Sequence, residues 1–142
     1  EGLLREELRE TFYSFDTTSL PDGEYVFRLS VSDAEANPEE KKAASRESGP
    51  VRVDNTAPVI RRLESTAGNF DFEAVDEGSP LQEAEYSVDA KEWVRVEPRD
   101  GLADSLAESY RIRIEPSARG GFLLIRVTDA SRNVAAASFT AP

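Results

Sequence analysis

Short stretches in which apolar and polar residues alternate recur throughout this chain of 142 residues. The clearest is EYVFRLSVSD, residues 24–33, in which every second residue from Tyr25 to Val31 is apolar. Side chains of a β-strand point alternately to its two faces, so this period of two predicts a strand with one buried face. The residues of that face are Tyr25, Phe27, Leu29 and Val31.

Similar short segments fill most of the chain and are separated by turn-forming residues. We expect further strands at residues 11–15, 51–53, 59–64, 69–75, 84–88, 93–96, 109–114, 122–128 and 134–139. Such segments favour an all-β antiparallel sandwich over alternating strands and helices. Residues 3–12 offer a helical alternative, because their leucines and Phe12 could form an apolar stripe. The expected core contains Phe72, Tyr86, Ile112, Leu123, Ile125 and Val127.

The chain carries one sequence motif twice. LSVSDAEAN at residues 29–37 and IRVTDASRN at residues 125–133 align Asp33 with Asp129 and Asn37 with Asn133. Thr-Ala-Pro follows each motif, at residues 56–58 and 140–142. The alignment predicts one complete unit at residues 57–142, preceded by the C-terminal half of a second unit at residues 1–56. Phe122 then falls on the wrong face of its strand unless a β-bulge intervenes.

Four longer runs resemble a known family. SLPDGEYVFRLSVSDAEANP, ASRESGPVRVDNTAP, AEYSVDAKEWVRVEPRDGLADSLAESY and VTDASRNVA are similar to the tandem immunoglobulin-like, fibronectin type III-like modules of large bacterial envelope proteins, which often adjoin β-propeller repeats. The resemblance implies a seven-stranded Greek-key sandwich, an extracytoplasmic location and a non-catalytic role as a spacer or docking module beside other modules. Such modules often carry Gly-Gly or Asp-Gly in the hairpin before the Trp, where this chain has Asp89-Ala90-Lys91.

Composition argues against several other functions. The formal net charge of −11 repels the phosphates of nucleic acids and of anionic lipids. No segment approaches the roughly 20 apolar residues of a membrane span, so neither nucleic acid nor insertion into a membrane is expected. Without histidine and cysteine the chain has no Ser-His-Asp or Cys-His relay.

Clustered glutamates could suggest a glycosidase, which uses a pair of carboxyl groups. A small sandwich has no deep cleft to raise the pKa of one of them, so we expect solvated surfaces instead. These glutamates are Glu6, Glu7, Glu10, Glu39, Glu40, Glu83 and Glu85. We therefore expect no enzyme activity and no cofactor required for folding.

The aligned aspartates permit two interpretations. Asp33 and Asp129 end strands, where a carboxylate can accept backbone N–H bonds of the next turn, and the asparagines that follow tolerate a left-handed backbone. The alternative is calcium, because acidic oxygens at a strand end beside Asp54 and Asn55 resemble the linkers of cadherin-like repeats. The calcium candidates are Asp33, Asp54, Asn55 and Asp129, which Asp76 and Glu77 could complete.

Two surfaces could bind other molecules. Trp93 and Tyr86 could form a platform on which a carbohydrate stacks, although a lone Trp beside a hairpin is usually covered by its own sheet. The half unit at residues 1–56 leaves the face of Tyr25, Phe27, Leu29 and Val31 in need of cover. Because a complete sandwich uses its apolar faces internally, we expect the cover to come from the same segment of a second chain, giving a homodimer.

Overall fold

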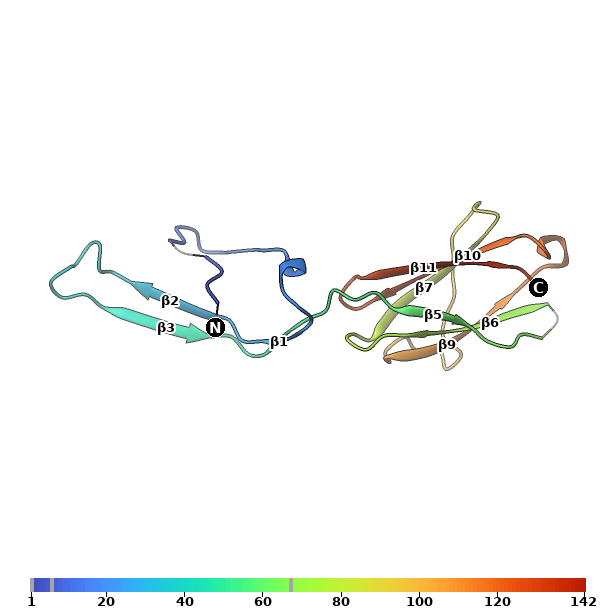
Figure 1. Ribbon diagram of the computed structural model, residues 1–142, viewed down its shortest axis with the longest axis horizontal. Coiled ribbons are helices and arrows are strands. Elements are labelled where there is room, and N and C mark those ends of the chain that lie inside the picture. Colours follow the sequence, from blue (N-terminus) through green and yellow to red (C-terminus); the bar gives the residue numbers. More distant parts are fainter. Residues whose placement is uncertain (1, 6, 67) are drawn as a thin grey trace.

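The computed structural model describes residues 2–5, 7–66 and 68–142, and its regular secondary structure consists almost entirely of antiparallel strands. Figure 1 shows an elongated molecule with a sandwich of strands at one end and a long hairpin at the other. Outside the strands, the described residues form two short 3₁₀ turns, Thr17–Ser19 and Pro116–Ala118. The predicted all-β antiparallel class is confirmed.

The sandwich contains the last seven strands and consists of two sheets. One sheet has the order β5-β6-β9, and the other has the order β11-β10-β7-β8. The bounds are β5 Val59–Arg62, β6 Asn69–Val75, β7 Leu81–Val88, β8 Val94–Arg95, β9 Ala107–Arg113, β10 Phe122–Asp129 and β11 Val134–Thr140. Side chains from both sheets meet in one hydrophobic core, in which the rings of Phe72 and Tyr110 stack with centroids 4.7 Å apart.

Alternation along the strands explains how the core forms. In β10, Leu123, Ile125 and Val127 are fully buried, whereas the residues between them reach the outer face. Phe72 and Ile112 are buried opposite them, as predicted, and Tyr86 is half-buried against the same core. Phe122 is 52% exposed and lies on the outer face of β10, so no β-bulge before this strand is needed to bring its ring into the core. The shift in register lies at the other end of β10, between Thr128 and Asp129.

The first four strands form two separate two-stranded sheets. β1 Gly23–Tyr25 pairs with β4 Val51–Val53, and β2 Arg28–Ser32 pairs with β3 Ala43–Glu47. The predicted strand at residues 24–33 is therefore broken. Phe27 still exchanges hydrogen bonds with Ser48, but Pro50 has no amide hydrogen with which to continue the ladder.

The strand predicted at residues 11–15 is wrong, and the helical alternative for residues 3–12 is not adopted by its described residues. Glu6 lies outside the described residues. Instead, Phe15 contacts the rings of Tyr13 and Phe27, at centroid distances of 5.8 and 5.5 Å. The strand β3 was not predicted, because its sequence AASRE has no alternation of large apolar residues.

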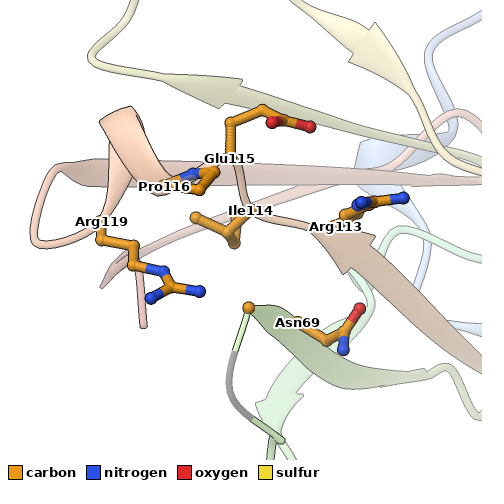
Figure 2. Close-up of a pocket in the computed structure, with 7 residues that line it drawn as sticks. Asn69, Arg113, Ile114, Glu115, Pro116 and Arg119 are labelled. Carbon is orange, nitrogen blue, oxygen red and sulfur yellow. The ribbon is translucent and has the colours of Figure 1, made fainter.

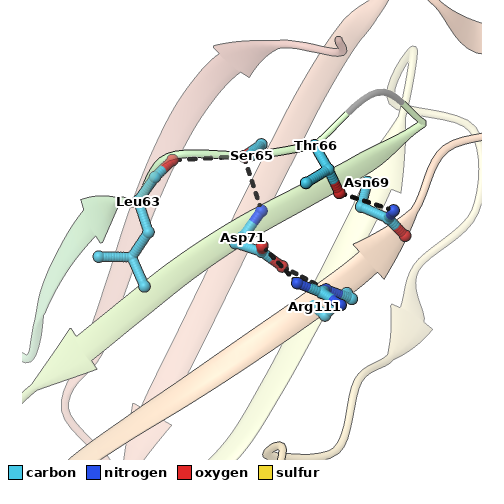
Figure 3. Close-up of polar contacts among 6 residues, drawn as sticks. All are labelled: Leu63, Ser65, Thr66, Asn69, Asp71 and Arg111. Carbon is cyan, nitrogen blue, oxygen red and sulfur yellow. Dashed lines mark hydrogen bonds and ion pairs between the residues drawn. The ribbon is translucent and has the colours of Figure 1, made fainter.

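The outer face of the three-stranded sheet carries an ion pair between a buried aspartate and an exposed arginine (Figure 3). Arg111 donates two hydrogen bonds to the carboxylate of Asp71, at 2.7 and 2.8 Å, and these hold the pKa of Asp71 below its ordinary value. The Ser65 hydroxyl accepts the backbone N–H of Asp71 at 3.0 Å and so holds the β5–β6 connection against β6. This buried carboxylate thus has a positively charged partner within the protein.

The β7–β8 hairpin turns through two residues with a left-handed backbone. Asp89 and Ala90 have φ values of 54° and 56°, and the amide of Lys91 donates to the carbonyl of Val88 at 3.3 Å. Two successive positive φ values are those of a type I′ turn. Glycine is the preferred residue at the second central position of such a turn, which Ala90 occupies here. The turn therefore forms at a cost in backbone strain at Ala90.

We predict that Ala90→Gly stabilises the fold by about 0.5–1 kcal/mol, because glycine adopts this φ without strain. Chemical denaturation of the two proteins measures the difference. Ala136→Gly, at an exposed position within β11, is the matched control and should destabilise the fold. A lower stability for Ala90→Gly would show that the turn is not strained.

Candidate functional site

The connector between β4 and β5, residues 54–58, joins the two ends of the molecule (Figure 1). It begins directly after Val53, which is 2% exposed and ends β4. Two successive residues of this connector, Asp54 and Asn55, make hydrogen bonds in opposite directions along the chain. These bonds define the site.

Asn55 is bonded to the N-terminal segment. Its amide nitrogen donates to the backbone carbonyls of Thr17, at 3.1 Å, and Leu20, at 2.9 Å, and its amide oxygen accepts from the Thr17 hydroxyl at 3.2 Å. The carboxylate of Asp22 accepts the backbone N–H of Asn55 at 2.7 Å and the hydroxyl of Thr56. Every polar group of the Asn55 side chain is therefore engaged by residues 17–20.

Asp54 is bonded to the sandwich. Its backbone carbonyl accepts from the side-chain amide of Asn133 at 3.0 Å, and its carboxylate accepts from the hydroxyl of Ser79. The side chain is buried, with 6% of the residue exposed. A Cβ atom added at Gly78 would collide with this carboxyl group, so only glycine at position 78 leaves room for it.

Asp54 meets two further buried aspartates at this end of the sandwich. Asp76 follows β6 and Asp129 ends β10, and they are 4% and 0% exposed. One carboxylate oxygen from each of the three residues lies within 4.8 Å of the other two. We call Asp54, Asp76 and Asp129 the aspartate cluster.

The hydrogen bonds of the aspartate cluster leave one oxygen without a partner. Asp129 accepts the backbone and side-chain N–H groups of Asn133, both at 2.8 Å. Oδ1 of Asp76 accepts the amides of Gly78 and Ser79, both at 2.7 Å. Oδ2 of Asp76 is buried and accepts no hydrogen bond in the described structure.

The aspartate cluster gathers negative charge in a region shielded from water. Two unit charges about 5 Å apart repel by roughly 3–4 kcal/mol at an effective dielectric constant of about 20. Among the described residues, no lysine or arginine forms an ion pair with any of the three aspartates. If all three carboxyl groups are ionised, this repulsion is therefore not offset by an ion pair with any described lysine or arginine.

The four calcium candidates from the sequence do not form one site. Asp54 and Asp129 come together, whereas Asn55 points its amide to residues 17–20. Asp33 lies at the end of β2, where its carboxylate accepts the amide of Lys42 at 2.5 Å. The capping role is thus observed for Asp33, and also for Asp129. Glu77 is exposed.

The sequence predicts Asp76 only as a residue that could complete the calcium candidates, although Asp76 is a full member of the aspartate cluster. Its signal was local: it follows the last residue of an alternating strand and precedes Gly78. Neither Asn37 nor Asn133 adopts the left-handed backbone that asparagine tolerates. Arg132, with a φ of 71°, adopts that conformation in place of Asn133.

The candidate interface is only partly covered within one chain. Tyr25 and Phe27 are half-buried, and the Tyr25 hydroxyl donates to the carbonyl of Pro21 at 2.6 Å. Leu29 and Val31, further along the same segment, are 55% and 56% exposed. Two of the four predicted interface residues therefore present apolar surface to solvent.

The aromatic platform is occupied on one side by the protein itself. Trp93 is 41% exposed, but the guanidinium group of Arg126 lies 4.4 Å from its ring centroid. Glu85 fixes Arg126 in turn through an ion pair of 2.5 Å. Because this ring face is covered by an ion-paired arginine, stacking of a carbohydrate there would have to displace it.

A hollow at the other end of the sandwich is open and charged. Figure 2 shows Arg119 reaching between the turn before β6 and the segment after β9, with Asn69 and Ile114 beside it. Arg113, Glu115 and Arg119 are all exposed. Solvated charges of both signs in an open hollow give little selectivity for a ligand.

No model of a known protein family matches this chain, and no curated protein matches it. Among the described residues, no helix is long and apolar enough to cross a membrane.

We predict that acid breaks the hydrogen bonds of Asp22. The Thr56 hydroxyl and the Asn55 amide hold the pKa of Asp22 below its usual value of 3.8. A lowered native pKa adds stability above the pKa of the unfolded chain, and this stability is lost as the pH falls through the native value. The backbone amide resonance of Asn55 should therefore shift in an NMR pH titration, with a midpoint at a pH below 3.8.

Asp22→Asn should abolish that titration of the Asn55 amide. The amide of Thr18, which donates to Asp16 at 2.9 Å, is an internal control and should titrate in both proteins. A titration of Asn55 that persists in the variant would assign it to another group.

Proposed function

We propose that this chain is a non-catalytic structural module of a larger extracytoplasmic bacterial protein, in which its connector fixes the direction between successive β-units. Residues 57–142 act as a complete immunoglobulin-like, fibronectin type III-like sandwich. Residues 1–56 act as the C-terminal half of a second module. The location and the family rest on the sequence resemblance, and the mechanical role rests on the connector.

One observation carries the mechanical role: adjacent residues of the connector are held by opposite parts of the molecule. Asn55 bonds to Thr17 and Leu20, whereas Asp54 bonds to Ser79 and Asn133. A flexible linker leaves its polar groups to water. Here the side chains of Asp54 and Asn55 form hydrogen bonds with other residues of the protein, and these bonds restrict rotation about the connector.

The topology is consistent with a Greek-key module. The chain crosses between the two sheets after β6, after β8 and after β9, and it forms the antiparallel pair β10–β11 last. In the repeat alignment β2 corresponds to β10, and β3 falls beside it as β11 does. This correspondence supports the division into one complete unit and one half unit.

We predict that the two parts keep a single relative orientation. Nitroxide labels on Ser45→Cys in β3 and Ser138→Cys in β11, both exposed sites, should give a narrow distance distribution by pulsed electron paramagnetic resonance. Asn55→Ala should broaden it, because residues 17–20 lose their bonds to the connector. Asn69→Ala, whose side chain donates to Thr66 at 3.2 Å, is the control and should leave it narrow. A broad distribution in the unsubstituted background would refute a rigid spacer.

A second role, dimerisation, is favoured by the exposed face of the half unit. β10 pairs with both β11 and β7, whereas its counterpart β2 pairs only with β3 among the described residues. Leu29 and Val31 lie within β2 and are more than half exposed. The sandwich fills its own core, so a second copy of the chain is the occupant that we propose.

We predict a homodimer through residues 1–56 in sedimentation equilibrium. Val31→Glu should dissociate it, because a charge would be buried in the shared apolar face. Val134→Glu, at a position of similar exposure on β11, should leave the dimer intact. A monomer at every accessible concentration, or equal effects of the two substitutions, would contradict this role.

A further inference from the structure

We infer that the aspartate cluster binds a calcium ion, with Asp54, Asp76 and Asp129 as its ligands. The site lies where the connector enters the sandwich, because Asp54 begins the connector, Asp76 follows β6 and Asp129 ends β10 in the opposite sheet. The cation site stands independently of the spacer role proposed above. Only its consequence for the connector rests on that role.

Two independent observations support the site. The first is the convergence of three carboxylates within 4.8 Å, each at least nine-tenths buried. The second is the unused oxygen of Asp76, which is shielded from solvent and receives no hydrogen bond in the described structure. A buried carboxylate oxygen without a donor is costly unless a ligand fills the position. Together they indicate a cation between the three groups.

The hydrogen bonds hold the aspartate cluster in place from the outside. Gly78 and Ser79 donate to the other oxygen of Asp76, and Asn133 donates to Asp129. Their amide hydrogens fix the direction of the carboxylates and leave lone pairs of the oxygens for a metal. Gly78 also leaves space for Asp54 that any larger residue would fill. The protein therefore orients these carboxylates before the ion arrives.

The chemistry of the donors selects a hard cation. All three ligands are carboxylates, and the hydroxyl of Ser79, which donates to Asp54, lies 2.6 Å from the hydroxyl of Ser131. Oxygen ligands suit Ca²⁺ and Mg²⁺, whereas zinc prefers nitrogen and sulfur. Ca²⁺ accepts six to eight oxygens in irregular geometry, and Mg²⁺ demands a near-ideal octahedron. A cluster assembled from a connector and two strand ends fits the less demanding ion.

Calcium would also affect the connector. Without the ion, Asp54 is repelled by Asp76 and Asp129, which opposes its burial. With the ion bound, each of the three carboxylates is attracted to the cation. This attraction holds Asp54, at the start of the connector, against the sandwich. If the connector acts as a spacer, calcium increases its rigidity.

The experiment compares calcium binding and thermal stability in the full chain after removal of metals with EDTA. Calorimetric titration with CaCl₂ should show one site, and calcium should raise the melting temperature by several degrees. MgCl₂ at the same concentration should raise it less, and NaCl of equal ionic strength should leave it almost unchanged. These salts separate a specific site from general screening of a chain with net charge −11.

Asp76→Asn tests the ligand directly and should remain folded. Its amide oxygen can still accept the bonds from Gly78 and Ser79, and its amide nitrogen removes one negative charge from the cluster. Without metal the variant should therefore melt higher than the unsubstituted protein. Its calcium affinity should fall by at least about tenfold, so that a given concentration of calcium raises its melting temperature less than that of the unsubstituted protein.

Two control variants should keep the full calcium response. The first is Asp33→Asn. Asp33 is the repeat counterpart of Asp129 but is not part of the aspartate cluster, and its carboxylate accepts the amide of Lys42. Asp71→Asn removes another buried carboxylate, which is paired with Arg111, and should lower the melting temperature with and without calcium.

Several results would overturn the calcium site. One is the absence of binding heat and of a thermal shift at millimolar CaCl₂, and another is an equal response to Mg²⁺. An unchanged response in Asp76→Asn would place the ion elsewhere. The spin-label distances decide the spacer role separately: calcium binding with a broad distribution would retain the site and reject the rigid connector.

Discussion

The arrangement of this molecule depends on the burial of one carboxyl group, that of Asp54. A charged side chain at the first position of a connector would ordinarily remain in water, where its hydration is favourable. Here Gly78 makes room for it, and Ser79 and Asn133 bond to the residue. Because Asp54 is held, the adjacent Asn55 is directed toward the N-terminal segment. The direction of the connector thus follows from a packing feature of the sandwich.

The repeated motif shows how one local structure acquires two chemical environments. Asp33 and Asp129 each accept a backbone amide bond at a strand end, from Lys42 and Asn133, so each carboxylate closes the connection to the next strand. Only Asp129 has other carboxylates beside it, because two strand ends and the connector meet there. A turn can be recognised from a few residues, whereas a cluster depends on distant parts of the chain.

The accuracy of the sequence predictions follows the same division. The strands β6 and β10 were predicted closely, because their alternation serves a core that the chain itself completes. The N-terminal segment was predicted poorly: the alternation of residues 24–33 says nothing about Pro50, which lies opposite and interrupts the ladder. Likewise β3 forms through its pairing with β2 and not through an apolar pattern of its own. The site was half predicted, since Asp54 and Asp129 were paired but the separation of Asp33 depends on the tertiary fold.

Two buried carboxylate environments in this sandwich differ in the source of their compensating charge. Asp71 has Arg111 across the β6–β9 pair, with two short hydrogen bonds, so the charge is balanced when the strands pair. The aspartate cluster instead receives only neutral donors from the described residues. Neutral donors stabilise each carboxylate singly but do not remove the repulsion between them. Folding alone can therefore satisfy Asp71, whereas the calcium ion that we propose would supply the positive charge that the aspartate cluster does not receive from the described residues.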